Sequence, residues 1–167
     1  MDNVRSLNVS RPKVLNDPAL KKATSIQLGD MVMYAYDPKL KATLPYYDRF
    51  PLAIVIDVRK DGFDALNLHY LRPDIRAAFL DELLKLGPSE PTEKSRLTKL
   101  RYNLIKGSTK FKEFKPCYKR YLSEHVKSSM ARVPMTDWEI AIFLPTEQFK
   151  KAGLGKVFSD SISIAKG

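Results

Sequence analysis

The sequence predicts a small α+β domain in which an antiparallel sheet of four or five strands packs with three helices. Three observations support this. Apolar residues alternate over residues 31–36, a β-branched run over 52–58 ends in the turn dipeptide Asp61-Gly62, and helically spaced apolar residues over 73–86 precede Gly87-Pro88. A sheet of this size could also roll into an SH3-like barrel. The chain has 167 residues, 8 Phe and 8 Tyr, enough for one domain with a core.

The first strand is predicted over residues 31–36 and has apolar residues on both faces. Met31 and Met33 fall on one face, and Val32 and Tyr34 on the other. We therefore expect the strand to be covered on both sides. The Asp37-Pro38 dipeptide should end it, because proline lacks an amide donor.

A hairpin is predicted next, with residues 52–58 as a central strand and 63–70 as the returning strand. Its corner is rich in aromatic residues at Tyr46, Tyr47 and Phe50. His69 stands alone on its face of the returning strand, with no partner at metal-ligand spacing. It is interpreted as a packed or edge histidine and not as a metal or catalytic one.

Further elements follow the hairpin. A helix is predicted from Asp74 to Leu86, beginning next to Pro73, which suits a first helical turn. A second helix should run from about Thr92 to Ile105 and a third from about Pro116 to Met130. The alternation in residues 138–144 predicts a strand that returns to the sheet, and residues 145–151 a short helix.

The predicted domain organisation has three parts. Residues 1–27 form an extended basic arm, 28–151 the α+β domain, and 152–167 an extended C-terminal tail. Two interpretations of the arm stay open: a floppy tail, or a segment that orders on a neighbouring subunit.

Composition narrows the class of protein. No run approaches the ~18 apolar residues of a membrane span, and the N-terminus lacks the apolar core of a signal peptide. The single cysteine, Cys117, excludes an internal disulfide, so we expect an intracellular protein or one assembled inside a cell. We expect no cofactor, because the chain has no phosphate loop, dinucleotide fingerprint or zinc spacing.

No catalytic residue is predicted. Cys117, paired with a histidine, could act as a nucleophile, but a lone cysteine beside aromatic residues is usually core filler. Four acids near the hairpin could form the metal site of a nuclease, although turn and strand-edge positions explain them as well. These acids are Asp48, Asp57, Asp61 and Asp64. The chain is therefore expected not to be an enzyme.

The strongest compositional feature is positive charge. The net charge is +10, which favours anionic partners. Most of it falls between residues 94 and 120, where aromatic residues are interleaved with basic ones, a mixture able to hold a phosphate backbone and stack on bases. A solvated lysine face is the alternative. The candidate nucleic-acid or anion contacts are Lys94, Arg96, Lys99, Arg101, Lys106, Lys110, Lys112, Lys115, Lys119 and Arg120.

Five segments carry motifs made mainly of Tyr, Phe, Pro and Asp: residues 29–39, 44–52, 61–71, 114–122 and 138–145. Together they resemble a family of virion- or DNA-associated proteins of T-even-like contractile-tailed bacteriophages. The resemblance covers roughly residues 29–150 and implies a shared fold, but it brings no catalytic residue. It also suggests protection of DNA ends as a role.

Two functions are therefore expected. The first is a non-enzymatic structural component of a tailed-phage particle, assembled in the host cytoplasm, that binds other virion proteins through its tails and basic face within a larger assembly. The alternative is a protein that binds DNA and protects or positions its ends through residues 94–120. An enzyme acting through the hairpin acids ranks last, and a membrane partner is not expected.

Overall fold

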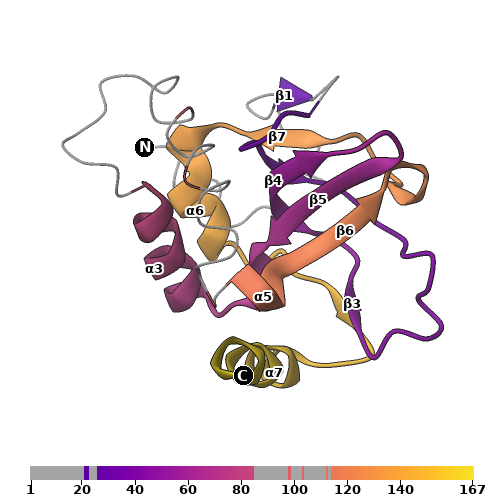
Figure 1. Ribbon diagram of the computed structural model, residues 1–167, viewed down its shortest axis with the longest axis vertical. Helices are drawn as coiled ribbons and strands as arrows, with labels where there is room; N and C mark the ends of the chain where they lie inside the picture. The colour runs from indigo at the N-terminus through magenta and orange to yellow at the C-terminus, as the bar shows by residue number, and fades with distance from the viewer. Residues whose placement is uncertain (1–20, 23–25, 85–97, 99–102, 104–111, 113) are drawn as a thin grey trace.

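A computed structural model describes residues 21–22, 26–84, 98, 103, 112 and 114–167. Its main feature is a six-stranded antiparallel sheet in the order β1-β7-β2-β4-β5-β6, next to a two-stranded ribbon, β3-β8 (Figure 1). The strands are β1 (Lys21–Lys22), β2 (Met31–Met33), β3 (Tyr47–Asp48), β4 (Leu52–Val58), β5 (Gly62–Asn67), β6 (Tyr118–Leu122), β7 (Ala131–Val133) and β8 (Phe149–Lys150). The α+β prediction is confirmed. The sheet is open, with β1 and β6 at its edges, so the SH3-like barrel is not confirmed.

Four α-helices surround this sheet in the described residues. They are α3 (Pro73–Leu84), α5 (Phe114–Cys117), α6 (Trp138–Phe143) and α7 (Leu154–Lys166). Helices α3 and α6 pack together, and α7 contacts α5. Figure 1 shows α3 and α6 beside the sheet and α7 below it. Short 3-10 helices are η1 (Leu68–Tyr70), η2 (Ser123–His125) and η3 (Met135–Asp137).

Strand β2 is buried on both faces, as the double apolar alternation predicts. Met31 and Met33 belong to a core cluster that includes Trp138 of α6 and Leu80 of α3. Val32 belongs to a second cluster, rich in aromatic residues, on the other face. In this second cluster Tyr34 meets Tyr36, Phe63 and Tyr121 edge to face, and so do Tyr36 and Tyr121, at centroid distances from 4.8 to 6.2 Å.

The predicted hairpin is present as β4 and β5, and helix α3 lies where the apolar spacing places it. The register pairs Ile54 with Leu66 and shifts between Val55 and Asp57, where the extra residue forms a β-bulge. Residues 85–91 and most of the predicted second helix, 92–105, lie outside the described residues.

The prediction of a third helix over residues 116–130 is wrong. Residues 118–122 form β6, which pairs with β5 so that Tyr121 lies opposite Phe63. The four-residue apolar spacing fits a helix, but the hydrogen-bonding edge of β5 and the aromatic cluster stabilise a strand instead. Tyr118, which was expected in the core, is 47% exposed.

Two predictions near the C-terminal side are also wrong. Residues 138–144, expected to form a strand, begin with helix α6, in which Trp138, Ala141 and Ile142 are buried. That spacing of three and four residues is helical, although the same run also alternates. Residues 145–151, expected to form a helix, contain β8, which pairs with β3.

The C-terminal segment 152–167 is not an extended tail. Residues 154–166 form α7, with Val157 and Ser161 buried against the domain. In the predicted arm, Lys21–Lys22 pairs with β7 as strand β1, and most of the arm lies outside the described residues. The three-part division of the chain otherwise stays a prediction.

Gly62 lies opposite Leu122, where the backbone of β6 is close to β5. A Cβ atom here would collide with the backbone carbonyl oxygen of Tyr121. We expect Gly62→Ala to lower the free energy of unfolding by about 1–3 kcal/mol, since the strands would have to separate. Urea denaturation measures this.

The matched control is Gly155→Ala, because a Cβ atom at Gly155 in α7 would meet nothing within 4 Å. Alanine favours helix by up to about 1 kcal/mol over glycine, so this variant should be as stable as the original chain or slightly more. Equal destabilisation of both variants would contradict the close approach of β5 and β6.

Candidate nucleic-acid interface

The ribbon β3-β8 is tied to the sheet by the carboxylate of Asp48, which is 4% exposed. Its Oδ1 accepts hydrogen bonds from the backbone N–H groups of Phe50 and Gln148, at 3.0 and 3.1 Å. Its Oδ2 accepts from Asn67 Nδ2 at 3.1 Å and lies 2.7 Å from His69 Nδ1. The carboxylate therefore has a partner for each of its four lone-pair positions, which explains how it can be buried.

His69 connects this carboxylate to the segment before β8. Its Nε2 atom lies 3.1 Å from the hydroxyl of Thr146. The order Asp48, His69, Thr146 is that of an acid–base–nucleophile triad. However, His69 has no exposed surface and Thr146 is 4% exposed, so a substrate has no access. The prediction of a packed His69 is confirmed, and the cluster is structural.

A second buried charge, Arg76, lies next to this cluster. Its guanidinium donates to the backbone carbonyls of Leu71 at 2.6 Å and Ile142 at 2.8 Å. Glu147 is its ionic partner at 3.6 Å. Burial lowers the pKa of Arg76, and Glu147 opposes that effect. Helix α3, the end of α6 and the approach to β8 are thereby held together.

Replacing Asp48 should destabilise the fold. The NH2 group introduced by Asp48→Asn would face two existing donors, either the N–H groups of Phe50 and Gln148 or the side chains of Asn67 and His69. The loss of one partner from a buried pair costs about 3–5 kcal/mol. Urea denaturation of this variant measures the loss. Asp57→Asn is the control, because Asp57 lies 58% exposed beside Arg59 and should leave the midpoint unchanged.

Acid should destabilise the protein through the same carboxylate. Burial by itself raises the pKa of Asp48, but His69 and the N–H donors outweigh it and hold the pKa below its usual value. A depressed carboxyl pKa contributes stability above the unfolded pKa near 4, and this is lost as the pH falls through the depressed pKa. Denaturation midpoints between pH 7 and 2 should therefore fall less steeply in Asp48→Asn. Parallel curves would contradict this role.

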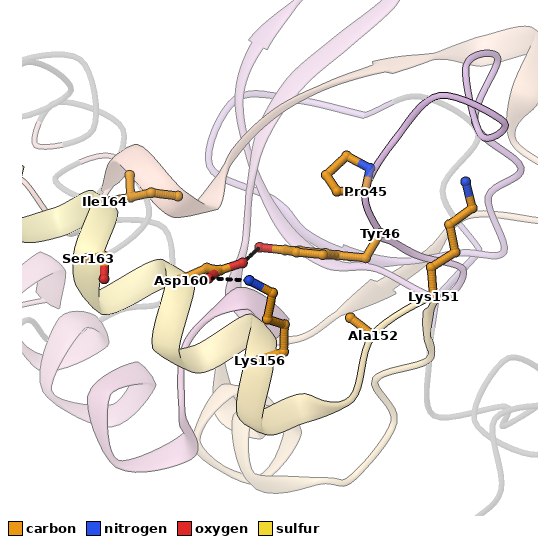
Figure 2. Close-up of a pocket in the computed structure, with 8 residues that line it drawn as sticks. All are labelled: Pro45, Tyr46, Lys151, Ala152, Lys156, Asp160, Ser163 and Ile164. Carbon is orange, nitrogen blue, oxygen red and sulfur yellow. Dashed lines mark hydrogen bonds and ion pairs between the residues drawn. The ribbon is translucent and has the colours of Figure 1, made fainter.

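An open groove of about 570 Å³ lies where α7 faces the loop before β3 (Figure 2). Its lining is largely apolar, with two lysines and one aspartate. The lining residues are Pro45, Tyr46, Lys151, Ala152, Lys156, Asp160, Ser163 and Ile164.

Lys151 fixes the loop on one side of the groove. Its ammonium donates to the backbone carbonyls of Lys41, Ala42 and Leu44, at 2.6, 3.2 and 2.9 Å. Lys151 has a φ of 74°, a conformation that is rare outside glycine. The three hydrogen bonds help to offset that strain, and they hold residues 41–44 next to the start of α7.

Tyr46 and Asp160 join the loop to α7 across the groove. The Tyr46 hydroxyl donates to Asp160 Oδ2 at 3.1 Å, and Lys156 donates to Asp160 Oδ1 at 3.0 Å (Figure 2). Burial and this hydrogen bond raise the pKa of Tyr46 to about 12. The Tyr46 ring also contacts Tyr70 and Phe149, each at a centroid distance of 6.2 Å. The Tyr46 ring, which forms the aromatic wall of the groove, is therefore held in place.

The segments that frame the groove carry more positive than negative charge. Residues 37–46 and 149–164 contain five lysines and two aspartates, and Asp37 already pairs with Lys41 at 3.0 Å. The lysines are Lys39, Lys41, Lys150, Lys151 and Lys156. The surroundings of the groove thus favour an anionic ligand.

The ten basic residues predicted as contacts are only partly within the described residues. Lys112 and Lys115 are exposed. Arg120 lies 3.6 Å from Asp61. Lys119 turns inward, with its ammonium 4.0 Å from the Tyr70 ring centroid, and burial lowers its pKa. The contact role of all ten stays a prediction, and Lys94, Arg96, Lys99, Arg101, Lys106 and Lys110 lie outside the described residues.

The predicted basic region nevertheless ends beside the groove. Helix α5, which carries the exposed Lys115, contacts α7. Tyr70, which Lys119 covers, also contacts Tyr46 in the groove wall. Both features place the C-terminal end of the basic region at the same end of the molecule as the groove.

The acids near the hairpin have separate partners in the structure. Asp64 binds Arg59 at 2.6 Å and accepts from Tyr118 at 2.7 Å, whereas Asp48 is buried with His69. Among the described residues, no group of three or more His, Cys, Asp or Glu is placed to hold a metal ion. Cys117 is buried, which raises its pKa to about 12 and disfavours the reactive thiolate.

The groove is the feature that sequence reasoning missed. Its wall α7 falls in the segment expected to be an extended tail. The available signal was helical spacing, since Leu154, Phe158 and Ile162 are four residues apart and follow Gly153. The loop and β8 reach the groove only through tertiary contacts.

The described residues define an α+β protein with an open antiparallel sheet and a lysine-framed groove, and none of their helices is long and apolar enough to cross a membrane. The family model described as phage T4 terminal DNA protecting protein matches residues 4–164, so the chain belongs to this family. The match confirms the resemblance to proteins of T-even-like phages. Comparisons with curated proteins and with solved structures gave no match.

Proposed function

We propose that the protein binds the ends of linear double-stranded DNA and protects them by occupying them. The observation that carries this proposal is the match to the terminal DNA protecting family over residues 4–164. Because the match covers almost the whole chain, the proposal concerns the entire domain and not one motif.

Charge supports the same function. The net charge of +10 suits a ligand that carries one phosphate per nucleotide, and each neutralised phosphate releases counterions. Lys112 and Lys115 are exposed at the end of the predicted contact region, where they can reach a phosphate backbone. The aromatic residues interleaved in residues 94–120 add possible stacking surfaces.

The proposed protection needs no catalytic step. An exonuclease must reach the last nucleotide, so a protein that covers this nucleotide blocks degradation by occupancy. The buried His69 and Thr146 are consistent with such a role, since neither can touch DNA. We therefore propose that the protein is not an enzyme.

The structural role in a phage particle is the less supported function. The family match favours DNA-end protection, and contacts with other virion proteins, like a location in the virion, stay predictions. Mass spectrometry of purified particles would test the location.

The test of the proposed function is an exonuclease-protection assay. Linear duplex DNA with bound protein should persist against an enzyme that degrades from the ends, and protection should weaken steeply as salt rises. Protein that leaves the rate of degradation unchanged at low salt would overturn the proposal.

Removing charges from the predicted contact region should weaken binding. A triple variant replaces Lys106, Lys110 and Lys112 with alanine. Each phosphate contact that is lost should make the slope of log affinity against log salt less steep by about 0.9. The matched control replaces three exposed cations elsewhere, Lys60, Arg72 and Lys127. Titration by fluorescence anisotropy at several salt concentrations measures both. An equal loss of slope in the two triple variants would contradict the assignment of the region.

A further inference from the structure

We propose that the groove between α7 and the loop before β3 binds the terminal nucleotide of a DNA strand. This inference rests on the proposed function and assigns it a site outside the predicted contact region. It accounts for a property that charge alone does not supply. Lysines attract any duplex, whereas protection of ends requires a preference for termini over internal sequence.

The size of the groove fits one nucleotide. Its volume of about 570 Å³ falls within the ~300–1,000 Å³ of small-ligand sites. A volume of this size does not hold a duplex, whose major groove alone is about 12 Å across. The groove can therefore admit a single unpaired nucleotide at a frayed or overhanging end, while the duplex lies against the surface outside.

The lining matches the two chemically different parts of a nucleotide. Pro45, the Tyr46 ring, Ala152 and Ile164 offer apolar and aromatic surface for a base. Lys156 reaches the groove from α7 (Figure 2), and its ammonium can pair with a phosphate. A phosphate without a base would leave the apolar wall unused.

Asp160 is also consistent with a nucleotide. Its two oxygens each accept one hydrogen bond, from Tyr46 and Lys156, and a carboxylate offers about four lone-pair sites. The remaining sites can accept from the amino or ring N–H groups of a base. Because Lys156 compensates its charge, Asp160 does not exclude an anion from the groove.

The walls of the groove are fixed before any ligand binds. Lys151 holds the loop through three carbonyls, and Tyr46 is held by Asp160 and by its aromatic neighbours. The β3-β8 ribbon is anchored by the buried carboxylate of Asp48. A preorganised site loses little conformational entropy on binding.

The same groove discriminates against the interior of a duplex. An internal base is paired and stacked, and it can enter a pocket only after both interactions are broken. A terminal nucleotide has fewer pairing and stacking interactions, so less free energy is needed to move it into the groove. A duplex whose ends are closed by hairpin loops has no terminal nucleotide to insert.

The experiment compares the affinity of the full chain for two DNAs of one sequence. One is a linear duplex with a single unpaired nucleotide at each end, and the other is closed by hairpin loops. The unaltered protein should prefer the linear DNA. Ile164→Asp, which places a carboxylate in the wall, should reduce the linear-to-closed affinity ratio about tenfold, as loss of one stacked base would. Lys156→Ala, which leaves Asp160 uncompensated, should reduce it in the same direction.

Two substitutions on the same helix serve as matched controls. Leu154 is 41% exposed and Ile164 46%, but Leu154 does not line the groove, so Leu154→Asp should leave the ratio unchanged. Lys166→Ala removes the same charge as Lys156→Ala away from the groove and should also leave the ratio unchanged. Thermal melts of every variant report folding, and the exposed Lys156 still gives a result if Ile164→Asp does not fold.

The outcomes separate this inference from the proposed function. Failure of the unaltered protein to bind either DNA would overturn both. Equal affinity for the two DNAs, or an unchanged ratio in folded groove variants, would overturn the groove assignment and leave DNA binding intact. Competition with deoxynucleoside monophosphates or inorganic phosphate distinguishes a strand terminus from a free ligand. Displacement of the linear DNA at equal concentration of either competitor would overturn the assignment to DNA ends.

Discussion

The buried contact between Asp48 and His69 is the interaction on which the rest of the structure depends. Asp48 lies in the ribbon, His69 lies in the 3-10 helix that follows β5, and Thr146 binds the opposite nitrogen of His69. Arg76 and Glu147 extend the network to α3 and α6. Removing charges from water is costly, so such a network is weak evidence for net stability. Its effect is geometric, because these polar groups are satisfied together only when the ribbon, the sheet and α3 meet in one arrangement.

The ribbon in turn places the candidate interface. Strand β8 continues through Lys151 into α7, and β3 follows directly after the loop that Lys151 holds. The groove is therefore formed by segments about 110 residues apart in sequence, as are Lys151 and its partner Lys41. Contacts through Tyr70 and α5 bring the end of the basic region to the same place. The proposed function thus has non-specific attraction by lysines and the proposed site for a terminus act on one DNA molecule.

Sequence reasoning succeeded where the local pattern and the packing agree. The hairpin, α3 and the double-sided burial of β2 were predictable, because turn residues, proline and apolar period all favour the same structure. The structures of residues 118–122 and 138–143 were not predictable. The apolar spacing of 118–122 favours a helix, but pairing with the edge of β5 makes the segment a strand. The spacing of 138–143 fits both a strand and a helix, and the contact with α3 selects the helix. For the candidate site, only the basic region was predictable, and its contact role stays a prediction.

By itself, the sequence determined the fold class, the strong positive charge and the resemblance to a phage family, because composition, short-range periodicity and motif residues carry that information. The tertiary structure decided that the C-terminal residues form a helix, that His69 is sealed inside with Asp48, and that Tyr46 and Lys156 share a groove. The physical reason is that burial and ion pairing depend on residues far apart in the chain, whose approach no local pattern encodes.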